Sequence, residues 1–103
     1  MLHPIIQAQL PIIVRLFETH NVKRAYAFGS VINDNFNDSS DIDLLVDFDD
    51  TVNTLDRGRI WWDLHDELRS LFNREVDLLI NGSLKNPYLR ADIDEKKQLI
   101  YAA

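Results

Sequence analysis

The chain has 103 residues, no cysteine and a formal net charge of −6, from 11 Lys and Arg against 17 Asp and Glu. Its length suits one domain with a single core, so we expect one domain over residues 1–103. The acidic balance disfavours DNA, RNA and anionic membranes as partners, because these are bound through basic surfaces. The lack of cysteine excludes disulfides and thiolate metal sites, and no segment approaches the roughly 20 apolar residues of a membrane span. We therefore expect a cytoplasmic protein.

The first predicted element is a helix over residues 4–20. Its apolar stripe, at helical spacing, is formed by Ile6, Leu10, Ile13 and Phe17. Pro11 interrupts this pattern, because proline lacks a backbone N–H and crowds the preceding turn. The helix is therefore either kinked at Pro11 or begins there, and the sequence leaves both alternatives open.

Two short apolar runs follow the first helix and are predicted as strands, over residues 22–28 and 41–48. The first run ends at Gly29, where a short helical turn is expected to start at Ser30. A polar loop over residues 33–40 then connects the two strands.

The second half of the chain predicts a long amphipathic helix over residues 54–73 and a third strand over residues 75–80. Asn81, Gly82 and Ser83 signal a turn. Residues 84–101 are predicted as a short turn and a final helix, which includes Leu99, Ile100 and Tyr101. This alternation of helices and strands favours an α/β (α+β) fold with a small mixed sheet packed against helices.

Asp41 and Asp43 stand one residue apart at the start of the second predicted strand. Side chains alternate along a strand, so both carboxylates project from one face. Carboxylate oxygens are the ligands that Mg²⁺ prefers, and Mg²⁺ usually keeps positions open for substrate phosphates. Asp77, a lone acid in the third apolar run, would complete the group if the two strands are neighbours. Three acids of this kind can hold two Mg²⁺ ions around a nucleoside triphosphate.

Gly29 and Ser30 suit the phosphate end of such a nucleotide. A glycine lets backbone amides approach a phosphate closely, and a serine hydroxyl can donate to it. Each feature also has an ordinary structural explanation: a solvated strand end for the Asp-x-Asp, a turn for the Gly-Ser and an exposed edge strand for Asp77. Their conjunction along one chain favours a phosphate and metal site.

These residues resemble the motifs of the nucleotidyltransferase fold of the DNA polymerase β superfamily, in particular the minimal nucleotidyltransferases. The similarity rests on Ala27-Phe28-Gly29-Ser30, Ser40-Asp41-Ile42-Asp43 and Val76-Asp77-Leu78-Leu79. The resemblance implies Mg²⁺-dependent transfer of AMP from ATP to a hydroxyl. By that match, Gly29 and Ser30 would hold the triphosphate, Asp41 and Asp43 would ligate both metals, and Asp77, a third metal ligand, would help to activate the acceptor.

Many minimal nucleotidyltransferases are antitoxins, and the resemblance therefore also implies a protein partner. Their partners are RNase toxins of the higher eukaryote and prokaryote nucleotide-binding (HEPN) class, which they silence by adenylylating a tyrosine. A hetero-oligomer with such a toxin is the expected assembly.

The chain departs from the family pattern directly after Ser30. Family members often carry one or two arginines there, whereas this chain has Val31, Ile32 and Asn33, followed by the acids Asp34 and Asp38. Arginine would clamp a phosphate and acids would repel it. An alternative function is therefore a non-catalytic antitoxin of the same fold that neutralises its partner by complex formation, with the tryptophan at position 62 as a candidate anchor.

Overall fold

The structure, a computed structural model, describes residues 3–32, 36–37 and 39–103. In chain order its elements are α1 (Pro4–Thr19), β1 (Val22–Phe28), the 3-10 turn η1 (Gly29–Ile32), β2 (Ile42–Phe48), α2 (Thr54–Phe72), β3 (Val76–Ile80), the 3-10 turn η2 (Asn81–Ser83), α3 (Pro87–Lys96) and β4 (Gln98–Ala102). The strands form one sheet of order β3-β2-β1-β4, in which β1 is antiparallel to both neighbours and β2 is parallel to β3. The predicted small mixed sheet packed against helices is confirmed.

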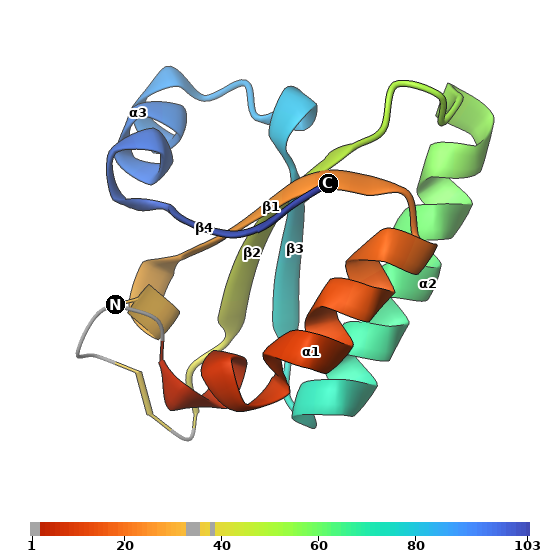
Figure 1. Cartoon of the computed structure of the whole chain (residues 1–103). Helices are drawn as coiled ribbons and strands as arrows, with labels where there is room; N and C mark the ends of the chain where they lie inside the picture. The colour runs from red at the N-terminus through yellow and green to blue at the C-terminus, as the bar shows by residue number, and fades with distance from the viewer. Residues whose placement is uncertain (1–2, 33–35, 38) are drawn as a thin grey trace.

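The sheet has helices on both faces, with α1 and α2 on one side and α3 on the other (Figure 1). The larger core lies under α1 and α2, where Phe17, Leu64 and Leu68 pack with the β2 residues Leu44 and Val46. A smaller core lies under α3 and contains Phe28, Leu45 and Ile93. Because α3 is short, its packing covers only part of its face of the sheet.

The first helix begins at Pro4 and runs without a break through Pro11 to Thr19. His3 caps its start, since the Nδ1 atom of His3 accepts a hydrogen bond of 3.1 Å from the backbone N–H of Ile5. Proline is well tolerated at the first helical position, where the missing N–H would have no partner inside the helix. A helix that begins at Pro11 is therefore ruled out.

The end of the chain differs from the prediction. The final helix ends at Lys96, and the predicted helical residues 98–101 belong instead to strand β4. Tyr101 pairs with Ala25 of β1, and its ring lies 5.5 Å from that of Phe17. The exposed backbone edge of β1 needs hydrogen-bond partners, and residues 98–102 supply them. This pairing determines the structure of the segment, although the spacing of its apolar residues after Leu89 and Ile93 also fits a helix.

Side chains of α2 cover the free edge of strand β3. The indole Nε1 of Trp61 donates to the carbonyl of Leu78 at 2.9 Å, and Nε2 of His65 lies 2.9 Å from the carbonyl of Val76. The rings of Trp61 and His65 also stack at 4.9 Å. Two outward-facing carbonyls of an edge strand are thereby occupied, which limits pairing with another chain at this edge.

Candidate active site

The turn at the end of β1 is built around Gly29. Its φ of 71° lies in the left-handed region, which glycine adopts at little cost. A Cβ atom at this position would lie 2.2 Å from Oδ2 of Asp43, closer than real Cβ contacts. Only glycine therefore allows the carboxylate of Asp43 to rest against this turn. The predicted phosphate-binding turn at Gly29 and the predicted metal ligand Asp43 therefore lie side by side.

The acidic residues meet through the sheet register. Asp43 pairs with Phe28 of β1 on one side and with Asp77 of β3 on the other. Neighbouring strands lie about 4.8 Å apart, so the side chains of Asp43 and Asp77 are adjacent on one face. Asp41 directly precedes β2 and is exposed. The condition that the two strands are neighbours is therefore met, and the three acids share one end of the sheet.

Asp43 differs from its two neighbours because it is half-buried, whereas Asp41 and Asp77 are exposed. Three causes together raise the pKa of Asp43 from 3.8 to about 6: burial first, then the nearby negative charges of Asp77 and of Asp41. A cation placed beside these carboxylates would neutralise this repulsion.

The three carboxylates of Asp41, Asp43 and Asp77 are therefore suitable ligands for Mg²⁺, because they provide oxygen atoms and a bound cation would offset their mutual repulsion. Over residues 3–32, 36–37 and 39–103, however, no group of three or more His, Asp or Glu side chains is already arranged around one metal position. The acids are neighbours, but their side chains do not form a finished coordination cage.

A cavity of about 530 Å³ lies beside this turn, in the range of small-molecule sites. Its walls come from two segments, and the residues are Phe28, Gly29, Ser30, Ile32, Leu89, Asp92, Ile93 and Lys96. The sequence motifs did not point to the wall that α3 forms. The signal that could have found it is the i, i+4, i+7 spacing of Leu89, Ile93 and Lys96, which places them on one helical face.

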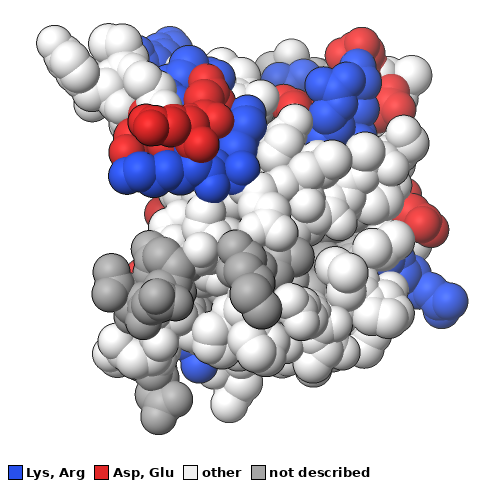
Figure 2. Space-filling model, turned by 60° about the vertical axis from the view of Figure 1, so that its left-hand side comes forward, with Lys and Arg blue, Asp and Glu red and all other residues white. Residues whose placement is uncertain are grey.

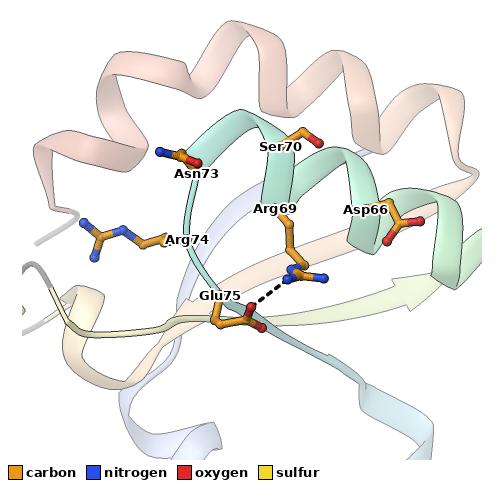
Figure 3. Close-up of a pocket in the computed structure, with 6 residues that line it drawn as sticks. All are labelled: Asp66, Arg69, Ser70, Asn73, Arg74 and Glu75. Atoms are coloured by element: carbon orange, nitrogen blue, oxygen red, sulfur yellow. Dashed lines mark hydrogen bonds and ion pairs between the residues drawn. The ribbon is translucent and has the colours of Figure 1, made fainter.

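A second cavity, of about 460 Å³, lies where α2 ends and β3 begins (Figure 3). Its two arginines are engaged with an acid of the cavity wall or with the neighbouring loop. Arg69 and Glu75 form an ion pair of 2.7 Å, the dashed line in Figure 3. Arg74 donates to the carbonyls of Asn37 and Ser40, at 3.1 and 2.9 Å. Arg74 therefore ties the segment that leads into Asp41 to the start of β3.

Basic and acidic side chains on the face shown in Figure 2 lie together in mixed clusters, beside a broad uncharged surface. The cluster at the upper left lies over α3, whose ion pairs are Asp92 with Lys96, Asp94 with Lys97 and Asp94 with Arg90. No continuous basic track crosses this face.

The two acids at positions 34 and 38 that follow Ser30 in the sequence lie outside the described residues. In the described part of the chain, no helix is long and apolar enough to cross a membrane.

The family model for polymerase beta nucleotidyltransferases matches residues 12–103. The chain belongs to this family. A relative from Methanocaldococcus jannaschii, named "Putative protein adenylyltransferase MJ0128", is 40% identical to this nucleotidyltransferase over 86 residues, which make up 84% of this chain and 82% of the relative. The family resemblance inferred from the sequence motifs is therefore confirmed.

Solved structures share the fold of this nucleotidyltransferase. A crystal structure of a toxin-antitoxin with AMP-PNP has a TM-score of 0.70 and 24% identity, and the match covers 91% of this chain and 73% of that one. The structure of a tri-AMPylated HEPN toxin of Shewanella oneidensis in complex with MNT antitoxin has a TM-score of 0.66 and 22% identity. This match covers 94% of this chain and 72% of that one. At these identities the likeness establishes the fold alone.

Proposed function

We propose that this nucleotidyltransferase transfers AMP from ATP to a hydroxyl of a partner protein, with Mg²⁺ as the cofactor. The observation that carries the proposal is the contact between Gly29 and the carboxylate of Asp43, with Asp77 in register beside it. A turn suited to phosphate and a group of carboxylates suited to a cation thus lie in one place. The name of the 40% identical relative, "Putative protein adenylyltransferase MJ0128", agrees with this reaction.

In this proposal every residue of the site has a role in binding the triphosphate or the metal ions. Gly29 and Ser30 hold the triphosphate through backbone amides and the serine hydroxyl. Asp41, Asp43 and Asp77 hold the metal ions, and a cation bound there would lower the raised pKa of Asp43. Bound Mg²⁺ supplies positive charge that neutralises the triphosphate and lowers the pKa of the attacking hydroxyl.

The transfer is a single displacement at the α-phosphorus of ATP. The acceptor oxygen forms a new P–O bond to the α-phosphorus, and the bond between that phosphorus and the bridging oxygen of the β-phosphate breaks. Pyrophosphate leaves with the electron pair. Asp77, which is exposed next to Asp43, accepts the proton of the acceptor hydroxyl. The residues therefore act mainly by holding charge and orienting the two reactants.

The partner in this proposal is a HEPN-type toxin in the cytoplasm, and the acceptor is a tyrosine hydroxyl of that toxin. Support comes from the two structural neighbours, one a toxin-antitoxin with AMP-PNP and one an AMPylated HEPN toxin with its antitoxin. The mixed charge clusters also agree with a protein acceptor, because nucleic acid would call for a basic surface.

The test uses ATP labelled at the α-phosphorus, Mg²⁺, the purified protein and a HEPN protein of the same organism. Label should pass to the HEPN protein from the α position and not from the γ position, and Asp43→Ala should abolish it. Asp47→Ala is the matched control, because Asp47 lies on the same strand face about 13 Å away, where it accepts a hydrogen bond from Asn81. Full transfer by Asp43→Ala would contradict the proposal.

A second candidate function is antitoxin action by binding alone. It is favoured by the lack of a preassembled metal cage among the described residues and by Trp62, whose side chain is 60% exposed on α2. In that case Asp43→Ala would still neutralise the toxin in cells, and Trp62→Ala would not. Loss of neutralisation by Asp43→Ala alone would exclude this alternative.

A further inference from the structure

The cavity beside the Gly29 turn has two chemically different parts. Phe28, Ile32, Leu89 and Ile93 form an apolar wall, and Ser30 and the Asp92 and Lys96 pair form a polar one. Pockets for small molecules combine an apolar lining with a few placed polar groups in this way. A nucleoside triphosphate has the matching parts, with a flat base and a charged chain.

We infer that Lys96 binds a phosphate group of the nucleoside triphosphate whose chain is held at Gly29 and Ser30. The inference rests on the proposed function and adds a residue from α3 to it. Lys96 is the basic residue that lines this cavity among the described residues, and Ser30 lines the same space from η1. A phosphate seated against the Ser30 turn is therefore within the cavity that Lys96 faces.

Other basic residues of the C-terminal segment are placed differently. Arg90 donates to the carbonyls of Asn81 and Leu84 and pairs with Asp94. Lys97 lies over the ring of Tyr26, with Nζ 4.3 Å from the ring centroid, and also pairs with Asp94. Neither residue lines the cavity. The positive charge that the family often supplies directly after the Gly-Ser turn would come, in this chain, from the last turn of α3.

In the structure Lys96 is paired with Asp92, at 2.8 Å, and the two side chains are 63% and 59% exposed. An exposed pair of this kind contributes little stability, because water competes for both charges. A triphosphate carries several negative charges and would displace the single carboxylate of Asp92. Asp92 would then act as a competitor that lowers nucleotide affinity, so the two residues should respond to substitution in opposite directions.

The experiment is calorimetric titration of the protein with AMP-PNP in the presence of Mg²⁺. Lys96→Met should raise the Kd by about tenfold, and Asp92→Asn should lower it about threefold. Lys97→Met is the matched control and should leave the Kd within about twofold of the original. A parallel titration with adenosine should show no difference between the original protein and Lys96→Met, because adenosine has no phosphate. Thermal melting of each variant checks that the fold is retained.

The outcomes separate this inference from the proposed function. If the original protein binds AMP-PNP and Lys96→Met binds it equally well, the inference is wrong and the proposed function stands. If Lys96→Met weakens adenosine as much as AMP-PNP, the phosphate contact is wrong. If the original protein binds no AMP-PNP at millimolar concentration, the proposed function and the inference both fail.

Discussion

Replacement of Gly29 by alanine tests the contact on which the proposed site depends. Gly29 has a φ of 71°, and an alanine in the left-handed region loses roughly 1–2 kcal/mol. Its Cβ would also lie 2.2 Å from Oδ2 and 3.1 Å from Cγ of Asp43, so the carboxylate must move. Overpacking of this kind costs about 1–3 kcal/mol. We therefore expect Gly29→Ala to lower the free energy of unfolding by about 2–5 kcal/mol.

Gly58→Ala is the matched control for this substitution. Gly58 lies inside α2, and nothing lies within 4 Å of a Cβ built there. Alanine is favoured over glycine in a helix by about 0.5–1 kcal/mol, so this variant should be more stable. Both variants can be followed by equilibrium urea unfolding with tryptophan fluorescence, and the midpoints compared at equal slope.

A double-mutant cycle with Asp43→Ala separates the two costs at Gly29. Asp43→Ala removes Oδ2 and Cγ and leaves the Cβ of residue 43, which lies 3.4 Å from the new methyl group, an ordinary contact. In that background Gly29→Ala should cost only the backbone strain of roughly 1–2 kcal/mol. An equal loss in both backgrounds would refute the contact between Gly29 and the Asp43 carboxylate.

Three further predictions concern residues that hold or surround the site. Because the pKa of Asp43 is about 6 in the folded protein against 3.8 ordinarily, the folded state keeps this proton longer, and the contribution of Asp43 to stability falls as pH rises from 4 to 6. Asp43→Asn should therefore gain stability over the original protein across this window in urea unfolding, with a constant difference above pH 6; a constant difference at every pH would contradict the shift. Arg74→Ala removes the donor at 2.9 Å from the Ser40 carbonyl and should cost about 1–2 kcal/mol, with faster amide exchange at the start of β2; unchanged exchange there would show that Arg74 does not hold this segment. Trp61→Phe keeps an aromatic ring but loses the donor to the Leu78 carbonyl, so a loss of about 1 kcal/mol is expected in the same assay, and an unchanged midpoint would argue against that bond.

Local patterns in the sequence predicted strands β1, β2 and β3 and singled out the three acids that lie at one end of the sheet. β1 begins and ends at the predicted residues, and α2 and β3 differ from their predictions by one residue. The sequence left open whether the strand of Asp43 lies beside the strand of Asp77, and the register shows that it does. These features are predictable because strand alternation and apolar runs depend on neighbouring residues in the chain.

The features that could not be predicted depend on contacts between distant segments. Strand β4 forms because β1 has a free edge, and its apolar residues also fit a helical spacing. The cavity under α3 needs the position of that helix relative to η1, which no local pattern contains. For the same reason the sequence alone did not single out Lys96, the basic residue that lines this cavity in the described part of the chain.

The in-register pairing of Asp43 with Asp77 makes the spacing of these acids a property of the backbone ladder. Neither residue is positioned by a loop, and the 19-residue helix α2 that connects their strands lies on the opposite face of the sheet. The turn before α2 and the outer surface of that helix can therefore vary in length and composition without changing the distance between the acids. This makes the chain a suitable scaffold for engineering, in which a recognition module is inserted near Asp50 while the acidic pair keeps its geometry.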